Sequence, residues 1–174
     1  MLFQIPAISQ NVYFTRTGQI YFLSHTEAID IDANNHQAAS FLDIVTGKMQ
    51  FAVLIKSFEF TLATAKEHFN ESYMESDKYP KAEFKGEIQN IDNFNLNNQG
   101  AYQVKVKGEI VIREIKKNIE VDAEIIVSDK VITAKSEFYL AISDFNIKVP
   151  KLLDHRVAKQ ILVKVNINYV LYQN

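Results

Sequence analysis

Long runs of strict apolar–polar alternation constrain the fold of this chain more than any other feature. In QILVKVNINYVLYQ, which begins at Gln160, apolar residues fall on one face of an extended strand and polar residues on the other. The same period of two occurs in AYQVKVKGEIVIR (101–113) and VITAKSEFYLAI (131–142). Each segment is therefore expected to form a β-strand with one buried and one solvent-facing side.

Further strands are predicted near 11–16, 19–25, 37–45, 49–60, 81–91 and 117–127. Turn signals separate many of them, at Thr17-Gly18, Thr46-Gly47, Asn95 to Gly100, Lys116 to Asn118 and Ser128 to Lys130. Long strands with short antiparallel connections favour a sandwich or a closed barrel over βαβ units. We favour an all-β, antiparallel up-and-down barrel of about eight strands, because closure removes exposed strand edges.

The segment ATAKEHFNESYME (63–75) departs from this strand pattern and predicts an amphipathic helix. Its acidic and apolar residues recur on separate helical faces, at Glu67, Glu71 and Glu75 and at Phe69, Tyr73 and Met74. Tyr79-Pro80 then requires extended backbone and ends the helix. Because the apolar face must be covered, we expect this short helix to close one end of the barrel.

Length and composition indicate one domain over residues 1–174, since 174 residues with 47% hydrophobic content can bury one substantial core. A net charge of −2 gives no long-range field to attract nucleic acid. The absence of cysteine excludes disulfides, thiolate metal sites and cysteine nucleophiles. No segment approaches the ~20 apolar residues of a membrane span, and the first residues lack the pattern of a signal peptide.

Candidate metal and catalytic motifs are weak. The histidines show neither an i, i+4 pair nor an H-x-H pair, so no zinc site is predicted. DIDANNH, from Asp30, resembles the start of a calcium loop, but Asn35 and Phe41 stand where glycine and glutamate are required, so a polar loop between strands is the better interpretation. No nucleophile, phosphate-loop, dinucleotide or metalloprotease motif occurs, and we expect neither an enzyme nor a cofactor.

The run LATAKEHFNESYMESDKYPKAEFKGEI followed by YQVKVKGEIVIREIKKNIEVDAEI resembles the YceI-like family of lipocalin-like, polyisoprenoid-binding barrels. The shared features are the short helix, Tyr79-Pro80 opening a strand with Ala82 and Phe84, the strand led by Gly108, and FYLAISDFNIKVP near the carboxyl end. The resemblance covers roughly residues 10 to 172. Two departures stand out: Val111 to Glu114 replaces the family's usual threonine-isoleucine-arginine-glycine, and no arginine precedes Asp144-Phe145.

The resemblance implies a barrel with an elongated apolar interior that holds a long-chain isoprenoid, such as a polyprenyl lipid or a quinone tail. It also implies a periplasmic or secreted location, although the sequence shows no signal peptide and a cytoplasmic location stays open. The predicted ligand-binding residues are Phe14, Phe22, Phe51, Phe58, Phe60, His68, Phe69, Tyr73, Met74, Phe84, Phe138, Leu140 and Phe145. Of these, His68, Tyr73 and Met74 are expected to contact the ligand head group.

Other interpretations stay open at this stage. Pattern alone favours a barrel filled by its own aromatic side chains, which would act as an interaction or stress-related structural protein. A barrel enzyme acting on a small apolar substrate is a weaker alternative, because a catalytic triad can assemble from distant positions. His68 also has the simpler interpretation of an exposed helix histidine. The outer faces of the long strands could pair two copies into a homodimer.

Overall fold

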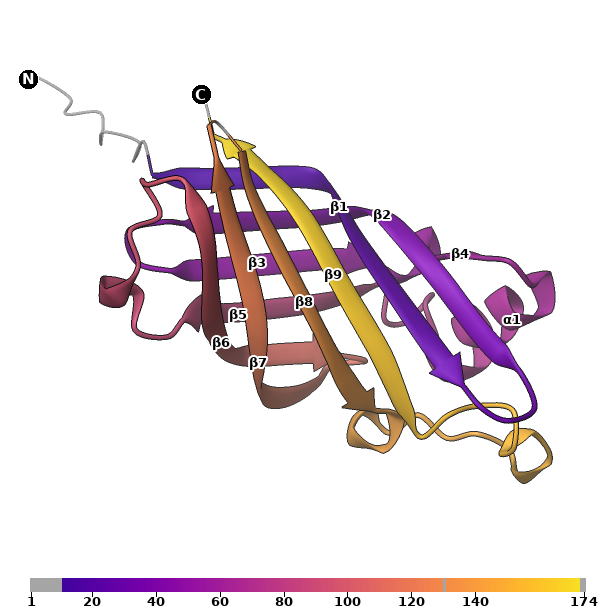
Figure 1. Cartoon of the computed structure of the whole chain (residues 1–174). Coiled ribbons are helices and arrows are strands. Elements are labelled where there is room, and N and C mark those ends of the chain that lie inside the picture. The colour runs from indigo at the N-terminus through magenta and orange to yellow at the C-terminus, as the bar shows by residue number, and fades with distance from the viewer. Residues whose placement is uncertain (1–10, 130, 173–174) are drawn as a thin grey trace, which may run out of the picture.

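The long strands pair in chain order around a closed ring, as Figure 1 shows for a computed structural model that describes residues 11–129 and 131–172. The strands are β1 (Val12–His25), β2 (Asp30–Asp43), β3 (Lys48–Leu54), β4 (Glu59–Phe60), β5 (Lys81–Ile88), β6 (Gly100–Ile112), β7 (Ile115–Ser128), β8 (Val131–Ala141) and β9 (Gln160–Leu171). Pairing of β1 with both β2 and β9 closes an eight-stranded antiparallel barrel, and β4 adds a short pairing beside β2. The predicted all-β barrel is confirmed.

Short helical elements connect the strands. They are η1 (Ile55–Ser57), α1 (Ala63–His68), the π-helical turn η2 (Phe69–Tyr73), η3 (Ile91–Asn93), η4 (Ile142–Phe145) and η5 (Lys151–Leu153). The predicted helix over 63–75 is confirmed as α1 followed directly by η2. No helix in the described residues is long and apolar enough to span a bilayer.

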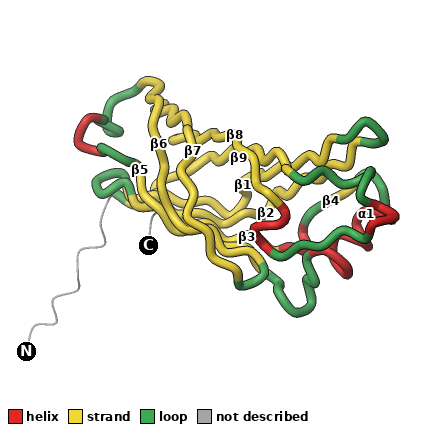
Figure 2. The backbone as a smooth tube through the Cα atoms, turned by 90° about the horizontal axis from the view of Figure 1, so that it is seen from below, coloured by secondary structure: helices red, strands yellow, loops and turns green. Residues whose placement is uncertain are grey.

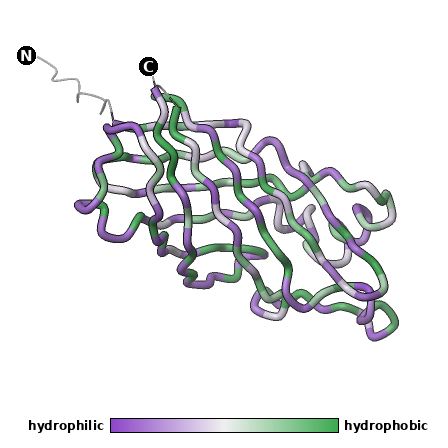
Figure 3. The backbone as a smooth tube through the Cα atoms, in the orientation of Figure 1, coloured by the Kyte–Doolittle hydropathy of each residue, from purple (hydrophilic) through white to green (hydrophobic). Residues whose placement is uncertain are grey.

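Alternation along each strand sets which side chains face inward, and Figure 3 shows the hydropathy changing from residue to residue along the strands. In β9, Ile167 and Tyr169 are completely buried, whereas the intervening Asn166 and Asn168 are exposed. Because successive side chains point to opposite sides of a strand, one face of every long strand is available to the barrel interior.

The predicted turn at Thr17-Gly18 is wrong, because β1 continues unbroken through these residues with two register shifts against β2. At Gly18 an added Cβ would lie 2.4 Å from Cδ1 of Ile167 and 3.0 Å from the Ala38 carbonyl oxygen. Only glycine fits there, so it lets β1 bend closely over the barrel core instead of ending the strand.

Two other segments also differ from prediction. Asp30 begins β2, so the residues that resemble a calcium loop form a strand and not a loop. The predicted strand over 49–60 is divided, because β3 ends at Leu54 and η1 separates it from β4. The turns at Thr46-Gly47 and at 95–100 are confirmed, and so is the connection from Ser128 to Val131. Lys130, within this connection, lies outside the described residues. Gln173, at the end of the predicted last strand, also lies outside them.

The turn between β6 and β7 falls at Arg113-Glu114, and not at Lys116 to Asn118 as predicted. Ile112 pairs with Ile115, which leaves a two-residue connection with positive φ at Arg113 (52°) and Glu114 (62°). Two-residue hairpins need this left-handed conformation at both positions, which usually selects Asn and Gly. In the turn motif of the family that the sequence resembles, the fourth residue is glycine, and Glu114 takes that position here.

The two ends of the barrel are covered differently. In Figures 1 and 2, α1 lies at one end and the segment between β5 and β6 lies at the other. Near this second end, the closed end, buried side chains form the main core, consisting of Leu42, Ile44, Met49, Ile88, Leu96, Val104, Val106, Ala123, Ile125, Val127, Ile132, Ala134, Ile167 and Tyr169. The main core therefore occupies the half of the barrel interior near the closed end, and the half nearer α1 lies outside it.

Candidate functional site

An apolar cavity of about 380 Å³ occupies the half of the barrel interior nearer α1. Its volume is in the range of pockets that hold drug-sized ligands. Side chains of all eight barrel strands and of α1, η2, η4 and η5 line it. The cavity is partly open to solvent at the α1 end, which we call the mouth.

The cavity walls are apolar side chains that face inward without being fully packed. They include Ile110 and Ile112 of β6, Ile119 of β7, Phe138 and Leu140 of β8, and Ile161 and Val163 of β9. All of these residues are only half-buried, although each belongs to the same inward-facing set as the core. Their remaining exposed surface faces the cavity, so an apolar ligand entering it would remove that surface from water.

The cavity floor is formed where the core begins, by Met49, Val106, Ile125, Ala134 and Val165. Deeper in the barrel, the Tyr169 hydroxyl lies 2.7 Å from Oγ of Ser40, which in turn donates to the Gln50 carbonyl at 2.8 Å. Burial raises the pKa of Tyr169 despite this hydrogen bond, so the phenol stays neutral. The closed half of the interior is thus filled and its buried polar groups are paired.

Four phenylalanines form an aromatic cluster beside the mouth. The Phe69 ring, at the junction of α1 and η2, lies 5.3 Å from Phe22, 5.6 Å from Phe58 and 5.0 Å from Phe60, measured between ring centroids. These separations are typical of favourable aromatic pairs. The cluster fixes the helical segment against β1, β4 and the loop after β3, and it forms one wall of the cavity.

All but one of the predicted ligand-binding residues line this cavity. Phe14 is the exception. The cavity brings together the other twelve, which are Phe22, Phe51, Phe58, Phe60, His68, Phe69, Tyr73, Met74, Phe84, Phe138, Leu140 and Phe145. Phe14 packs against Phe41 and Tyr172 on the outer wall of the barrel, because the bend at Gly18 changes which residues of β1 face inward. Contact of the other residues with a ligand stays a prediction.

Few polar groups reach the cavity, and the serines among them already have partners. Ser24 accepts a hydrogen bond from the Ala158 amide at 2.8 Å, and Ser136 donates to the Asp122 carbonyl at 2.7 Å. His68 is exposed at the mouth, and burial raises the pKa of Tyr73, which keeps its phenol neutral. Met74 is 7% exposed and belongs to the apolar wall, in contrast to its predicted head-group role.

Arg113, which the sequence analysis did not single out as a site residue, connects three segments near the mouth. Its guanidinium donates to the Phe145 carbonyl at 3.1 Å and to the Asn146 carbonyl at 2.7 Å, and it forms an ion pair with Glu75. It also lies over the Tyr79 ring, 5.5 Å from the centroid. Glu75, which the sequence analysis placed on the acidic face of the helix, therefore has a specific partner.

The same junction collects residues with unusual backbone conformation. Glu75, Arg113, Glu114 and Asn146 all have positive φ, and they come from the ends of η2, the β6–β7 turn and η4. Left-handed backbone at a residue other than glycine costs about 1–2 kcal/mol and persists only where surrounding contacts hold it. The Arg113 contacts supply that restraint, so this junction fixes the covering segments of the mouth to the barrel wall.

The titratable residues at the cavity do not form a recognisable catalytic or metal-binding group among the described residues. The described residues contain no group of three or more His, Asp or Glu side chains that could hold a metal ion. Its titratable lining residues, His68, Tyr73, Glu83, Lys135 and Arg156, are not joined to one another by any hydrogen bond or ion pair found in the described chain. The arrangement is suited to enclosing an apolar molecule.

Comparisons with known proteins agree with this fold. The barrel is similar to a polyisoprenoid-binding domain from Saccharophagus degradans implicated in plant cell wall breakdown, with a TM-score of 0.80, 11% identity, and coverage of 93% of this chain and 99% of that one. BcnA of Burkholderia cenocepacia gives a TM-score of 0.72 at 14% identity, covering 88% of this chain and 96% of that one. The YceI protein of Campylobacter jejuni gives 0.68 at 18% identity, covering 86% and 90%.

These identities support similarity of fold alone, and no curated protein matches the chain. The family model is more specific, because the model of the YceI-like domain matches residues 7–169. That match spans nearly the whole barrel and agrees with the resemblance carried by the helix and by Tyr79-Pro80. The chain therefore belongs to the YceI-like domain family.

Proposed function

We propose that this protein binds a long-chain isoprenoid, of the polyprenyl or quinone type, in the barrel cavity and sequesters or carries it. The observation that carries the proposal is the unfilled half of the barrel, an apolar cavity of about 380 Å³ that ends at a packed floor. A long hydrocarbon chain is the kind of ligand that such a surface would favour, because nearly all of its lining is apolar.

The binding energy would come mainly from the length of the chain. Each buried methylene contributes about 0.8 kcal/mol, so an isoprenoid with many carbons needs few polar contacts to bind tightly. We assign the buried chain to the walls around Phe138 and Leu140 and to the aromatic cluster. The head group would lie at the mouth, near His68 and Tyr73.

The fold relationship supports this assignment. The similar domain from Saccharophagus degradans is described as polyisoprenoid-binding, and its chain is covered almost completely by this one. A periplasmic or secreted location stays a prediction from the family resemblance. Homodimer formation likewise stays a prediction, which sedimentation of the purified protein would check.

The alternative of a filled, ligand-free barrel agrees with the closed end only. A fully packed interior would leave side chains such as Ile112 and Ile161 completely buried, whereas both are half-buried beside the cavity. For the alternative of an enzyme, no two titratable side chains that line the cavity are joined by a hydrogen bond or ion pair among the described residues. Enclosing an apolar ligand requires neither a fully packed interior nor a pair of interacting titratable groups.

Native mass spectrometry of the protein as purified, followed by organic extraction, tests the proposal. We expect one isoprenoid of defined mass per chain. Ala134→Phe places a large side chain at the cavity floor and should lower occupancy at least tenfold by removing space for the chain. Ala101→Phe, on the exposed side of β6, is the matched control and should retain the ligand.

An apo mass that persists after incubation with polyprenyl lipids and quinones would overturn the proposal. Equal occupancy in Ala134→Phe and the wild type would place any bound lipid outside the cavity. Circular dichroism of both variants shows whether the barrel is intact, which separates loss of the site from loss of the fold.

A further inference from the structure

The part of the β8–β9 connection that follows η4, residues 146–159 and here called the β8–β9 loop, combines two features that the binding cavity alone does not explain. Leu152, in η5, is 82% exposed and is the most exposed large apolar side chain among the described residues. The loop also carries four basic side chains, Lys148, Lys151, Arg156 and Lys159, against one carboxylate, Asp154, in a chain whose net charge is −2.

Within the described part of the chain, no carboxylate pairs with a basic side chain of this loop. Elsewhere, lysines on the barrel wall pair with acids, as Lys105 does with Asp122 at 2.8 Å and Lys164 with Glu137 at 3.1 Å. No ion pair found within the described chain involves a loop cation, and all four of these residues are exposed. Their charge is therefore available to an external partner.

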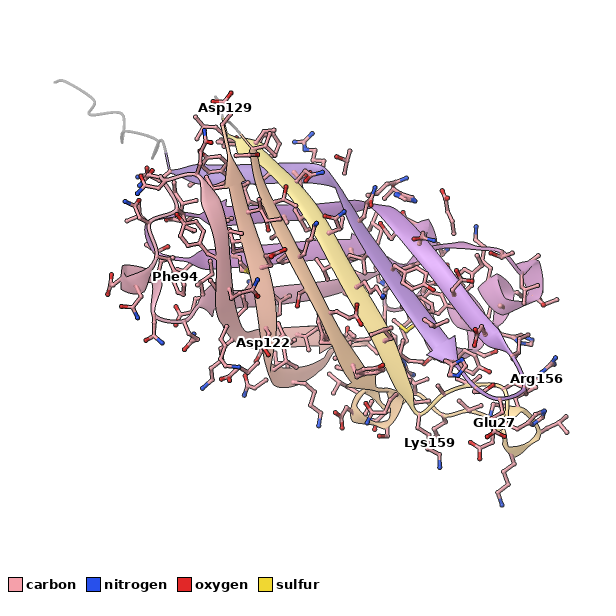
Figure 4. The ribbon with its side chains drawn as sticks, in the orientation of Figure 1. Glu27, Phe94, Asp122, Asp129, Arg156 and Lys159 are labelled. Carbon is pink, nitrogen blue, oxygen red and sulfur yellow. The ribbon has the colours of Figure 1, made fainter. Side chains whose placement is uncertain are left out.

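The loop lies at the cavity mouth. In Figure 4, Arg156 and Lys159 lie at the end of the barrel opposite Phe94, near Glu27 of the β1–β2 turn. Leu153, Arg156 and Val157 line the cavity, although their neighbour Leu152 points away from it into solvent. The loop is fixed at its base, since the Ala158 amide donates to Ser24 of β1.

The rim of the mouth is apolar beyond this loop as well. Leu62, just before α1, is 43% exposed, and it lines the cavity together with Ile29 of the β1–β2 turn. On the side formed by this loop, an apolar rim flanked by cations is suited to the boundary between lipid head groups and acyl chains, where leucine enters the apolar layer and lysine contacts anionic head groups. The exposed carboxylates at this end, Glu27, Glu67 and Glu71, belong to other segments, so the loop is the side that would face an anionic surface.

We propose that the β8–β9 loop docks the protein on the surface of an anionic lipid bilayer, with the cavity mouth facing the membrane. One exposed leucine and a few cations provide weak and reversible attachment, because each basic residue near such a surface contributes about 1 kcal/mol. A path from membrane to cavity would then pass between Leu152 and Leu62. Docking itself needs no ligand, whereas this loading path rests on the proposed isoprenoid function.

Flotation of the ligand-free protein with vesicles tests docking directly. We expect binding to vesicles of phosphatidylglycerol and phosphatidylcholine, weak binding to phosphatidylcholine alone, and loss of binding at high salt. Lys151→Glu with Lys159→Glu should weaken binding by more than about fivefold for each lysine replaced. Lys85→Glu with Lys107→Glu makes the same charge change at exposed positions of β5 and β6 and should leave binding near the wild-type level apart from the small effect of net charge.

A second pair of variants, one at the loop and one control, tests the apolar contribution to vesicle binding. Leu152→Ser should weaken vesicle binding about tenfold, since it removes most of the side chain that enters the lipid boundary. Val45→Ser, at a turn on the closed end where the side chain is 58% exposed, should have no effect. Both sites are on the surface, so circular dichroism should be unchanged in each variant.

Absence of wild-type binding to the anionic vesicles at low salt would overturn docking and direct attention to an acidic protein surface as the loop's partner. An equal loss in the loop pair and in the Lys85 and Lys107 pair would overturn it too, since net charge would then suffice. Transfer of an isoprenoid from vesicles to protein separates the two proposals. Docking without uptake would contradict the loading path and leave docking in place, and uptake unaffected by the loop variants would show that the isoprenoid enters without the docked loop.

Discussion

The closed end and the mouth of this barrel are built from the same strands but differ in how completely their inward side chains are covered. On β9, Ile167 is completely buried in the core, whereas Ile161, six residues earlier on the same face, is half-buried beside the cavity. The alternation that turns both residues inward is identical. Whether an inward side chain becomes core or cavity wall therefore depends on what lies opposite it and over the barrel end.

The two ends are covered by segments of different design. At the closed end, Ile91, Phe94 and Leu96 pack onto the core, and the Tyr102 hydroxyl lies within hydrogen-bond distance of the Asn95 and Asn98 carbonyls, at 2.9 and 3.0 Å, so that its one proton is shared between them. The cover at the mouth is a helical segment held mainly by the aromatic cluster and the Arg113 junction. The first arrangement fills the barrel, and the second covers it without filling it.

The largest effect should come from removing bulk at the closed end. Ile167→Ala should lower the free energy of unfolding by about 2–5 kcal/mol, because it leaves a void in a packed core. Ile161→Ala should cost less than about 1 kcal/mol, since its side chain already faces a cavity. Urea unfolding of both variants measures this difference. Equal losses would mean that the cavity walls are packed as tightly as the core.

An intermediate effect is expected at the Arg113 junction. Arg113→Met removes two charge-assisted hydrogen bonds and the ion pair with Glu75 from a side chain that is 14% exposed, at a cost of about 2 kcal/mol. Hydrogen exchange should increase in residues 63–79 and 142–147 and stay unchanged at the closed end.

Lys116→Met is the matched control for that variant. Lys116 pairs with Glu109 at 3.2 Å but is 69% exposed, so its loss should cost no more than about 0.5 kcal/mol. If Arg113→Met left exchange in the helical segment unaltered, the junction would have no part in holding the cover over the mouth.

The smallest effect is expected at the β2–β3 turn of the closed end. Partial burial opposes ionisation of Asp43, but hydrogen bonds from the Thr46 and Val45 amides, with smaller help from Lys48, lower its pKa overall. A lowered pKa contributes stability above the unfolded value of about 3.9, and that contribution is lost as pH falls through the folded value. Asp43→Ala should therefore cost about 1 kcal/mol at neutral pH.

The measurement for this turn is unfolding of both proteins as a function of pH. The wild-type and Asp43→Ala curves should converge as pH falls below about 4, because the protonated carboxyl no longer accepts both bonds as an anion. A constant difference over the whole range would show that Asp43 acts through packing and not through its charge.

Local pattern was sufficient to predict the barrel and the helix. Period-two alternation defined strands such as β9, and the periodic apolar residues followed by Tyr79-Pro80 defined the helix and its end. Twelve of the thirteen residues predicted to bind the ligand line the cavity, but most of its lining consists of aliphatic residues that were not singled out. Phe14 lies outside the cavity because the bend at Gly18 reverses the inward face of β1, and alternation alone does not locate such a bulge.

The Arg113 junction could not be predicted in the same way. The inward positions change from even numbers, at Ile110 and Ile112, to odd numbers, at Ile119 and Val121. That change indicates that a turn lies between these two pairs of residues. It does not locate the turn, and Arg113 and Glu114 lack the Asn-Gly composition typical of two-residue hairpins. The contacts of Arg113 with Glu75 and with the Phe145 and Asn146 carbonyls join positions more than thirty residues apart, so no local pattern reports them.

The closure of the ring through β1 and β9 also determines how the barrel responds to mechanical load. Tyr13 of β1 is paired with Leu171 of β9 at the closed end, where the Tyr172 amide donates to the Val12 carbonyl at 2.8 Å. A pulling force applied through these two strand ends would open the β1–β9 ladder from that end, one hydrogen bond after another, because the bonds lie across the strands. The mouth would be the last part of this seam to separate.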